Sequence, residues 1–144
     1  MEYDLRGWVD LGLPSGKLWA TKNEEGYFTF DEAVEKFQDQ LPTADDWNEL
    51  LNNTDYFFDE IHDRLIVEAP NGEKLYLPVT GYRDGTGLCR ATCDGNYWSA
   101  TPDDDEYDQG VVAWGLYFDF DYTETGMESI ARRCGLAVRL IKAK

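Results

Sequence analysis

Hydrophobic residues alternate with small or polar residues along the segment 111–121. The apolar series is Val112, Trp114, Leu116, Phe118 and Phe120, and the intervening series is Val111, Ala113, Gly115, Tyr117, Asp119 and Asp121. A period of two residues predicts a β-strand with one buried face and one solvent-facing face. The segment 135–142 repeats this pattern. We therefore expect the two segments to pair as a hairpin joined by a polar loop.

Two more hairpins are predicted upstream from their turn residues. Their strands are 8–13 and 17–20 in the first hairpin, and 64–69 and 74–79 in the second. Pro14-Ser15-Gly16 suits a tight reversal in the first. Asn71-Gly72 accepts positive φ angles in the second. Between the second hairpin and the C-terminal strands, the segment 81–87 has three glycines and is expected to form an irregular loop.

Two short helices are predicted between the hairpins. In the first, over 31–37, apolar residues recur on one helical face and acidic residues occupy the first turn. In the second, Thr43 caps the N-terminus, Asp45 and Asp46 lie in the first turn, and Asn52-Asn53 ends the helix. Two helices and several hairpins indicate an α+β fold.

Composition indicates one domain with an aromatic core. At 144 residues the chain is long enough for a single core, so one domain is expected over 1–144. Aromatic residues make up 15% of the chain. Large rings supply the burial that a small sheet needs, so we assign Trp98 and Trp114 to the core.

The charge balance disfavours several classes of partner. The formal net charge is −16, which repels phosphate backbones and anionic membrane surfaces, so nucleic acid is not an expected partner. No apolar run approaches about 18 residues, so no membrane insertion is expected. The acidic start Met1-Glu2-Tyr3-Asp4 does not look like a signal peptide. The expected location is cytoplasmic or virion-associated, or the cell surface if a leader was removed.

The cysteines leave two alternatives open. Cys89, Cys93 and Cys134 are odd in number, so at least one thiol is free or bonds between chains. Cys89 and Cys93 form a bridge if the loop between them folds back. Otherwise they are reduced thiols in a cytosol-like compartment.

A family resemblance begins in the segment 8–21. This segment resembles the opening of the Fibrobacter succinogenes major paralogous domain, a family common in gut Bacteroidetes and their phages. The later motifs in that family's order are Leu41-Pro42-Thr43 with Trp47 and Leu50, Pro70-Asn71-Gly72, Leu77-Pro78, Gly81-Tyr82-Arg83, Tyr97-Trp98-Ser99-Ala100-Thr101 and Gly135-Leu136-Ala137-Val138-Arg139. The resemblance covers nearly the whole chain, and several linked motifs are more specific than any one of them.

The resemblance implies a C-type-lectin-like fold, in which two short helices pack on small twisted antiparallel sheets with long loops over one face. Some members with this fold are variable proteins of diversity-generating retroelements, in which a reverse transcriptase rewrites adenines of the C-terminal coding region. Those proteins resemble receptor-binding tips or surface adhesins. The resemblance therefore implies a non-catalytic protein that displays a variable surface to a protein or glycan ligand.

The expected contact surface lies within about 103–134. Tyrosines flanked by adaptable polar groups give contact area at low entropic cost. The candidate residues are Tyr107, Tyr117, Asp119, Asp121, Tyr122, Glu124, Ile130, Ala131, Arg133 and Cys134. Relatives usually carry an aromatic pair where this chain has Arg133-Cys134, and we expect Ile130 and Cys134 to be exposed. Such a loop is either a sampled surface or one that has drifted without selection.

Metal and catalytic alternatives are weaker. No cofactor is expected, although the acidic loop 103–108 offers oxygen ligands for calcium if it is not simply a solvated face. Formylglycine-generating oxidases share the implied fold and bind copper through two cysteines, but nearer the C-terminal strands than Cys89 and Cys93. His62, the only histidine, is expected on the surface. An oxidase, or a structural domain of a surface or virion assembly, remains the alternative function.

Overall fold

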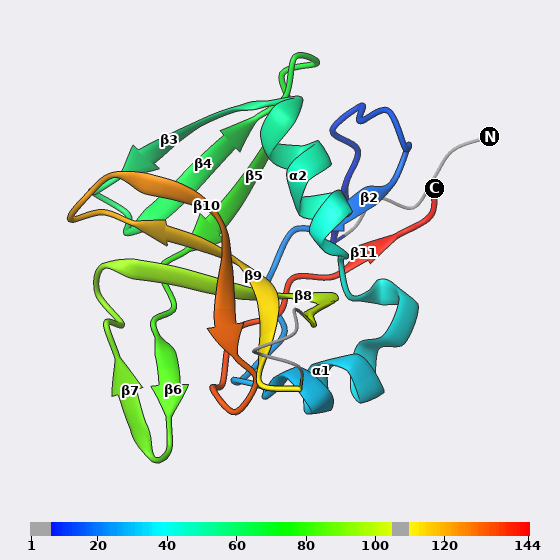
Figure 1. Ribbon diagram of the computed structural model, residues 1–144. Coiled ribbons are helices and arrows are strands. Elements are labelled where there is room, and N and C mark those ends of the chain that lie inside the picture. The colour runs from blue at the N-terminus through cyan, green and yellow to red at the C-terminus, as the bar shows by residue number, and fades with distance from the viewer. Residues whose placement is uncertain (1–6, 105–109) are drawn as a thin grey trace.

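The computed structural model describes residues 7–104 and 110–144. Within these ranges the chain forms two short α-helices and small antiparallel sheets (Figure 1). The α+β class and the two-helix, small-sheet arrangement are therefore confirmed. None of the described helices is long and apolar enough to cross a membrane.

Both helices begin within one residue of the predicted start. Helix α1 spans Phe30–Phe37 and helix α2 spans Ala44–Asn52, with a short 3-10 helix at Gln38–Gln40 between them. Each starts with a capping box, in which a threonine and an acid satisfy each other's backbone N–H groups. Thr29 and Glu32 form the first box, and Thr43 and Asp46 form the second. These local bonds explain why both starts are readable from sequence.

The first sheet joins the two ends of the described chain. Its strands are β1 (Trp8–Val9), β2 (Leu18–Ala20) and β11 (Ile141–Lys142), with β2 in the centre. The predicted N-terminal hairpin is confirmed, and its turn closes with a bond from Gly16 N–H to Leu13 O. Strand β11 pairs with β2 and not with 111–121, so the predicted C-terminal hairpin is wrong.

The central sheet has the strand order β10-β9-β8. Strand β8 spans Asp94–Asp103, β9 spans Val112–Asp119 and β10 spans Glu124–Ala131. The segment expected to be a polar loop is thus an eight-residue strand, paired with β9 along its whole length. Its sequence shows no clear alternation because it lies at the sheet edge and is only partly covered on both faces.

Strand β9 is not divided into one buried and one exposed face. Ala113 and Gly115, expected to face solvent, are buried, whereas Trp114 is only half-buried, so its assignment to the core is wrong. Side chains from later in the chain cover the small residues. A Cβ atom at Gly115 would lie 2.8 Å from Ile130 Cδ1 and 3.4 Å from Leu136 Cδ2.

A three-stranded sheet and a two-stranded hairpin complete the fold. The strands β3 (Asp55–Asp59), β4 (Arg64–Glu68) and β5 (Lys74–Pro78) form the third sheet, and β6 (Tyr82–Asp84) pairs with β7 (Gly87–Cys89). The predicted second hairpin is confirmed as β4–β5, with Gly72 at a φ of 89°. The expectation of an irregular loop over 81–87 is wrong, because a two-residue turn at Gly85 and Thr86 allows the flanking residues to pair.

The core consists of two aromatic clusters. One contains Trp19, Trp47 and Tyr97 and lies between α2, the third sheet and the central sheet. The other contains Phe30 and Trp98 and lies against α1. The ring of Trp98 is fully buried, as predicted. Strand β8 contributes Tyr97 to the first cluster and Trp98 to the second, so it links the two.

Candidate binding surface on the β9–β10 hairpin

Asp119 is a structural residue and not part of an exposed surface. It lies at the end of β9 and is 1% exposed. Its Oδ2 accepts a hydrogen bond from the Tyr117 hydroxyl at 2.6 Å, and its Oδ1 accepts one from the Asp121 N–H at 2.7 Å. The expectation that Asp119 faces solvent as part of the contact surface is therefore wrong, because these bonds hold the carboxylate under the hairpin turn.

Arg90 connects this carboxylate to the rest of the fold. Its Nε lies 2.9 Å from Asp94 Oδ2, and its Nη2 lies 3.3 Å from Asp119 Oδ2 and 3.0 Å from Asp121 Oδ2. Asp94 and Asp119 are both buried. The hydrogen bond to Asp94 and the charges around the guanidinium raise the pKa of Arg90. The turn end of the β9–β10 hairpin is thereby anchored to the turn before β8.

Replacing Asp119 with asparagine should remove part of the acid dependence of stability. Burial acts to raise the pKa of Asp119, but the hydrogen bonds from Tyr117 and Asp121 and the charge of Arg90 outweigh it and hold the pKa below 3.8. The unfolded chain therefore takes up this proton at higher pH than the folded chain. The stability that the carboxylate contributes is complete above about pH 5 and is lost as the pH falls.

Urea unfolding of the wild type and Asp119→Asn at several pH values measures this contribution. We expect the difference in unfolding free energy between them to shrink from about pH 4.5 downward. Asp39→Asn, an exposed position, serves as the control and should give no such trend. A difference between wild type and Asp119→Asn that stays constant across this range would contradict the assignment.

Three of the predicted residues gather at the hairpin tip. Tyr122 is 73% exposed, and Asp121 and Glu124 are also exposed. Tyr117 lies next to them on β9 and is half-buried; burial, followed by the hydrogen bond to Asp119, raises its pKa. The ring of Tyr117 is thus accessible in part while its hydroxyl is engaged. The structure brings these residues together as the sequence predicts.

The remaining predicted residues lie at the opposite end of β10. Ile130 and Ala131 are half-buried against the second aromatic cluster, and Cys134 is buried, so the expected exposure of Ile130 and Cys134 is wrong. Arg133 is exposed and pairs with Asp84 of β6 at 3.6 Å. An eight-residue strand is roughly 25 Å long. The predicted contact residues therefore do not form one continuous surface.

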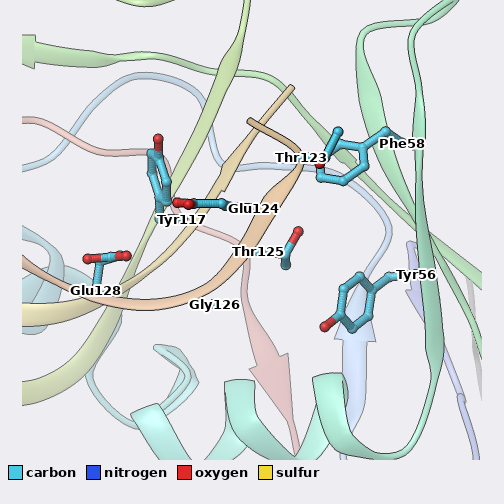
Figure 2. A pocket seen from close by; sticks show the side chains of 8 residues that line it. All are labelled: Tyr56, Phe58, Tyr117, Thr123, Glu124, Thr125, Gly126 and Glu128. Carbon is cyan, nitrogen blue, oxygen red and sulfur yellow. The ribbon is translucent and has the colours of Figure 1, made fainter. Parts of the chain in front are cut away.

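An open groove beside β10 adds residues that the sequence did not single out. Its volume is about 570 Å³, and it lies between β10 and β3 (Figure 2). The lining residues are Tyr56, Phe58, Tyr117, Thr123, Glu124, Thr125, Gly126 and Glu128. The run Tyr56-Phe57-Phe58 could have indicated an aromatic surface, since three consecutive aromatic residues of a strand cannot all point into one core.

A ring contact fixes the position of the hairpin against the third sheet. Phe58 of β3 and Phe120 at the end of β9 meet edge to face, with ring centroids 5.0 Å apart. Gly126 lies opposite Tyr117 in the β9–β10 register, and a Cβ atom there would meet nothing within 4 Å. The groove is thus bounded by the packed Phe58–Phe120 pair, and it stays open next to Gly126 because that residue has no side chain.

The described residues give no arrangement that points to a metal or a catalytic thiol. No group of three or more His, Cys, Asp or Glu within 7–104 and 110–144 is placed to hold a metal ion. All three cysteines are free, and burial raises the pKa values of the Cys93 and Cys134 thiols. His62 is exposed, as expected, and contacts Asp59 at 2.8 Å.

Two of the sequence predictions fall on residues outside the described part of the chain. Tyr107, a candidate contact residue, lies within 105–109, as does most of the acidic loop considered for calcium. Asp103 and Asp104, at the start of that loop, are described. Asp103 accepts a hydrogen bond from Ser129 at 2.8 Å, and Asp104 pairs with Arg132 at 2.6 Å. These two carboxylates thus have partners from the end of β10.

Comparison with known proteins found no matching family model, and neither a curated protein nor a solved structure matches the chain.

Proposed function

We propose that this chain is a non-catalytic binding module with a C-type-lectin-like fold, and that it displays the β9–β10 hairpin tip and the adjoining groove to a protein or glycan ligand. The family resemblance of the sequence motifs supports the fold. So does the arrangement of two short helices with small antiparallel sheets, in which β1 and β11, from opposite ends of the chain, flank the same strand β2. An ion pair of 2.7 Å between Lys144 and Asp10 adds to this closure.

The observation that carries the proposal is the contrast between Tyr122 and Asp119. Three positions apart, one side chain is 73% exposed and the other is 1% exposed. The buried carboxylate and Arg90 hold the end of β9 directly below the turn, while the tip presents a tyrosine and acidic groups to solvent. A rigid base below an exposed aromatic suits recognition, because little conformational entropy is lost on binding.

We also propose that the chain is the variable protein of a diversity-generating retroelement. The contrast between Tyr122 and Asp119 then indicates which residues vary. Exchange is tolerated where side chains contact solvent, and it is not tolerated where they hold the fold. Among the predicted contact residues, Tyr122 and Glu124 belong to the first group. Asp119 and Cys134 belong to the second, because both are buried.

The DNA next to the gene tests this proposal. We expect a reverse transcriptase gene and a second, near-identical copy of the 3′ coding region that differs from the first only where the copy has adenine. The differing codons should include those for Tyr122 or Glu124 and should leave those for Asp119 and Cys134 unchanged. The absence of such a copy, or differences that fall mainly on buried positions, would contradict the proposal.

A further inference from the structure

Strand β10 is an outer strand, and its free backbone edge follows from the register. The N–H of Arg132 donates to Val111 O at 2.9 Å, which makes these two residues a hydrogen-bonded pair. Such pairs alternate along an antiparallel ladder, so the even-numbered residues 124–130 direct their backbone groups toward β9. Thr125 and Met127 therefore direct theirs to the open edge. No backbone hydrogen bond joins either residue to another segment within the described part of the chain.

The groove described above lies along this open edge. Four consecutive residues, Thr123 to Gly126, line the groove. Because successive residues of a strand point to opposite faces, the groove extends over both faces of β10 and the edge between them. In Figure 2, Thr125 lies toward Tyr56 and Phe58, whereas Tyr117, Glu124 and Glu128 lie on the other side of β10. The two sides differ in chemistry, one being aromatic and the other acidic.

The acidic side lacks compensating charge. Glu124 and Glu128 are exposed, and neither side chain forms an ion pair or hydrogen bond with any other described residue. The residues that line the groove include no lysine, arginine or histidine. The whole chain carries a formal charge of −16, which adds a long-range attraction for cations. The groove is therefore electrostatically complementary to a basic ligand.

A buried polar atom at the edge also lacks a partner. The Oγ1 of Thr125 is buried and has no hydrogen-bond partner among the described residues. A buried hydroxyl without a partner costs free energy, so this part of β10 is not fully satisfied by the fold itself. The backbone N–H and C=O groups of Thr125 and Met127 at the open edge also have no partner among the described residues, and the backbone of an added strand supplies one. These edge groups point to a ligand that carries hydrogen-bonding groups as well as charge.

We propose that a basic, extended segment of a partner protein adds to the open edge of β10, with lysine or arginine side chains toward Glu124 and Glu128 and apolar side chains against Tyr56 and Phe58. This inference names the partner class for the proposed binding function and rests on it. Main-chain hydrogen bonds give such an added strand its affinity, and its alternating side chains give it specificity. The acidic and aromatic sides of the groove match that alternation.

Terminally blocked peptides of eight residues, the length of β10, provide the probe. The first alternates lysine with valine or phenylalanine. The second replaces each lysine with glutamate. The third keeps the first sequence but carries N-methyl groups on alternate amides, which removes the donors that face β10. We expect calorimetry to detect binding of the first peptide only, with backbone N–H signals of Thr125 and Met127 shifting in NMR spectra of the complex.

Two double variants of equal net charge distinguish the effect of the groove carboxylates on binding from the effect of the overall charge. Glu124→Gln with Glu128→Gln should weaken binding of the first peptide about tenfold, because two exposed charge pairs are lost. Glu25→Gln with Glu73→Gln removes two exposed acids away from the groove and should leave the affinity unchanged. Both double variants keep the fold, since none of the four side chains is buried.

Four results would overturn the inference. The first three are equal effects of the two double variants, equal binding of the N-methylated peptide, and no binding of the first peptide. If free lysine or calcium binds as tightly as the first peptide, the groove takes cations in general and strand addition is wrong. Each of these results leaves the template-copy comparison intact, so the proposed function stands or falls separately.

Discussion

Replacing Trp98 with alanine is expected to cost about 3–5 kcal/mol of unfolding free energy. The side chain is fully buried in β8 and packs against Phe30, with ring centroids 5.5 Å apart. Its Nε1 donates to Phe28 O at 2.6 Å, and its carbonyl accepts from Trp47 Nε1 at 3.2 Å. Truncation leaves a large cavity beside α1 and a buried carbonyl at Phe28 without its donor.

Chemical unfolding monitored by circular dichroism measures this loss. Trp98→Phe should lose less than Trp98→Ala, because the ring volume is largely kept and the indole hydrogen bond is the main loss. Tyr122→Ala serves as the control, since that ring is 73% exposed and should change stability by less than about 0.5 kcal/mol. If Trp98→Ala is no more costly than Tyr122→Ala, the assignment of Trp98 to the core is wrong.

The second large effect is expected at Arg139. This arginine is 1% exposed and pairs with no carboxylate among the described residues. Its guanidinium donates to Asn23 Oδ1 at 2.8 Å, Ala20 O at 3.0 Å and Tyr76 O at 2.7 Å. Burial lowers the pKa of Arg139. Two separate segments, residues 20–23 and strand β5, thus depend on one side chain for hydrogen-bond donors.

Arg139→Ala should destabilise the fold by about 3–5 kcal/mol, because three acceptors lose their donor and each costs about 1–3 kcal/mol if it stays dry. Arg139→Lys should recover only part of this, since an ammonium group cannot replace a planar fork of five donors. Urea unfolding of the three proteins gives the comparison. A lysine variant as stable as the wild type would show that the geometry of the guanidinium does not matter.

Elements fixed by local chemistry were predictable from sequence. The capping boxes at Thr29 and Thr43 satisfy backbone groups within four residues, so both helix starts were readable. The Asn71-Gly72 turn likewise specifies a hairpin through residues that are adjacent in the chain. Strand β10 was not predictable in this way. Its Thr, Gly, Ser and Glu residues have weak strand patterning, and pairing with β9 decides its structure.

The candidate site was predictable only at its tip. Tyr122 lies on the turn and Glu124 is the first residue of β10, and both are exposed as expected. The alternating pattern of 111–121 placed Asp119 on a face exposed to solvent. That pattern carries no information about Arg90, which lies 29 positions away in the sequence and covers this face. The groove was missed for the same reason, because Tyr56 and Glu128 meet only through the packing of two sheets.

The central claim is that the exposed side chains of the β9–β10 hairpin can be exchanged, whereas the buried side chains that hold the fold cannot. Two libraries compared side by side test this claim most directly. One library randomises Tyr122, Glu124 and Glu128 together, and the other randomises Asp119 and Cys134 together, with cooperative thermal unfolding measured for members of each. The account predicts that most members of the first library unfold within a few degrees of the wild type, whereas most of the second do not fold. Similar losses in both libraries would contradict it.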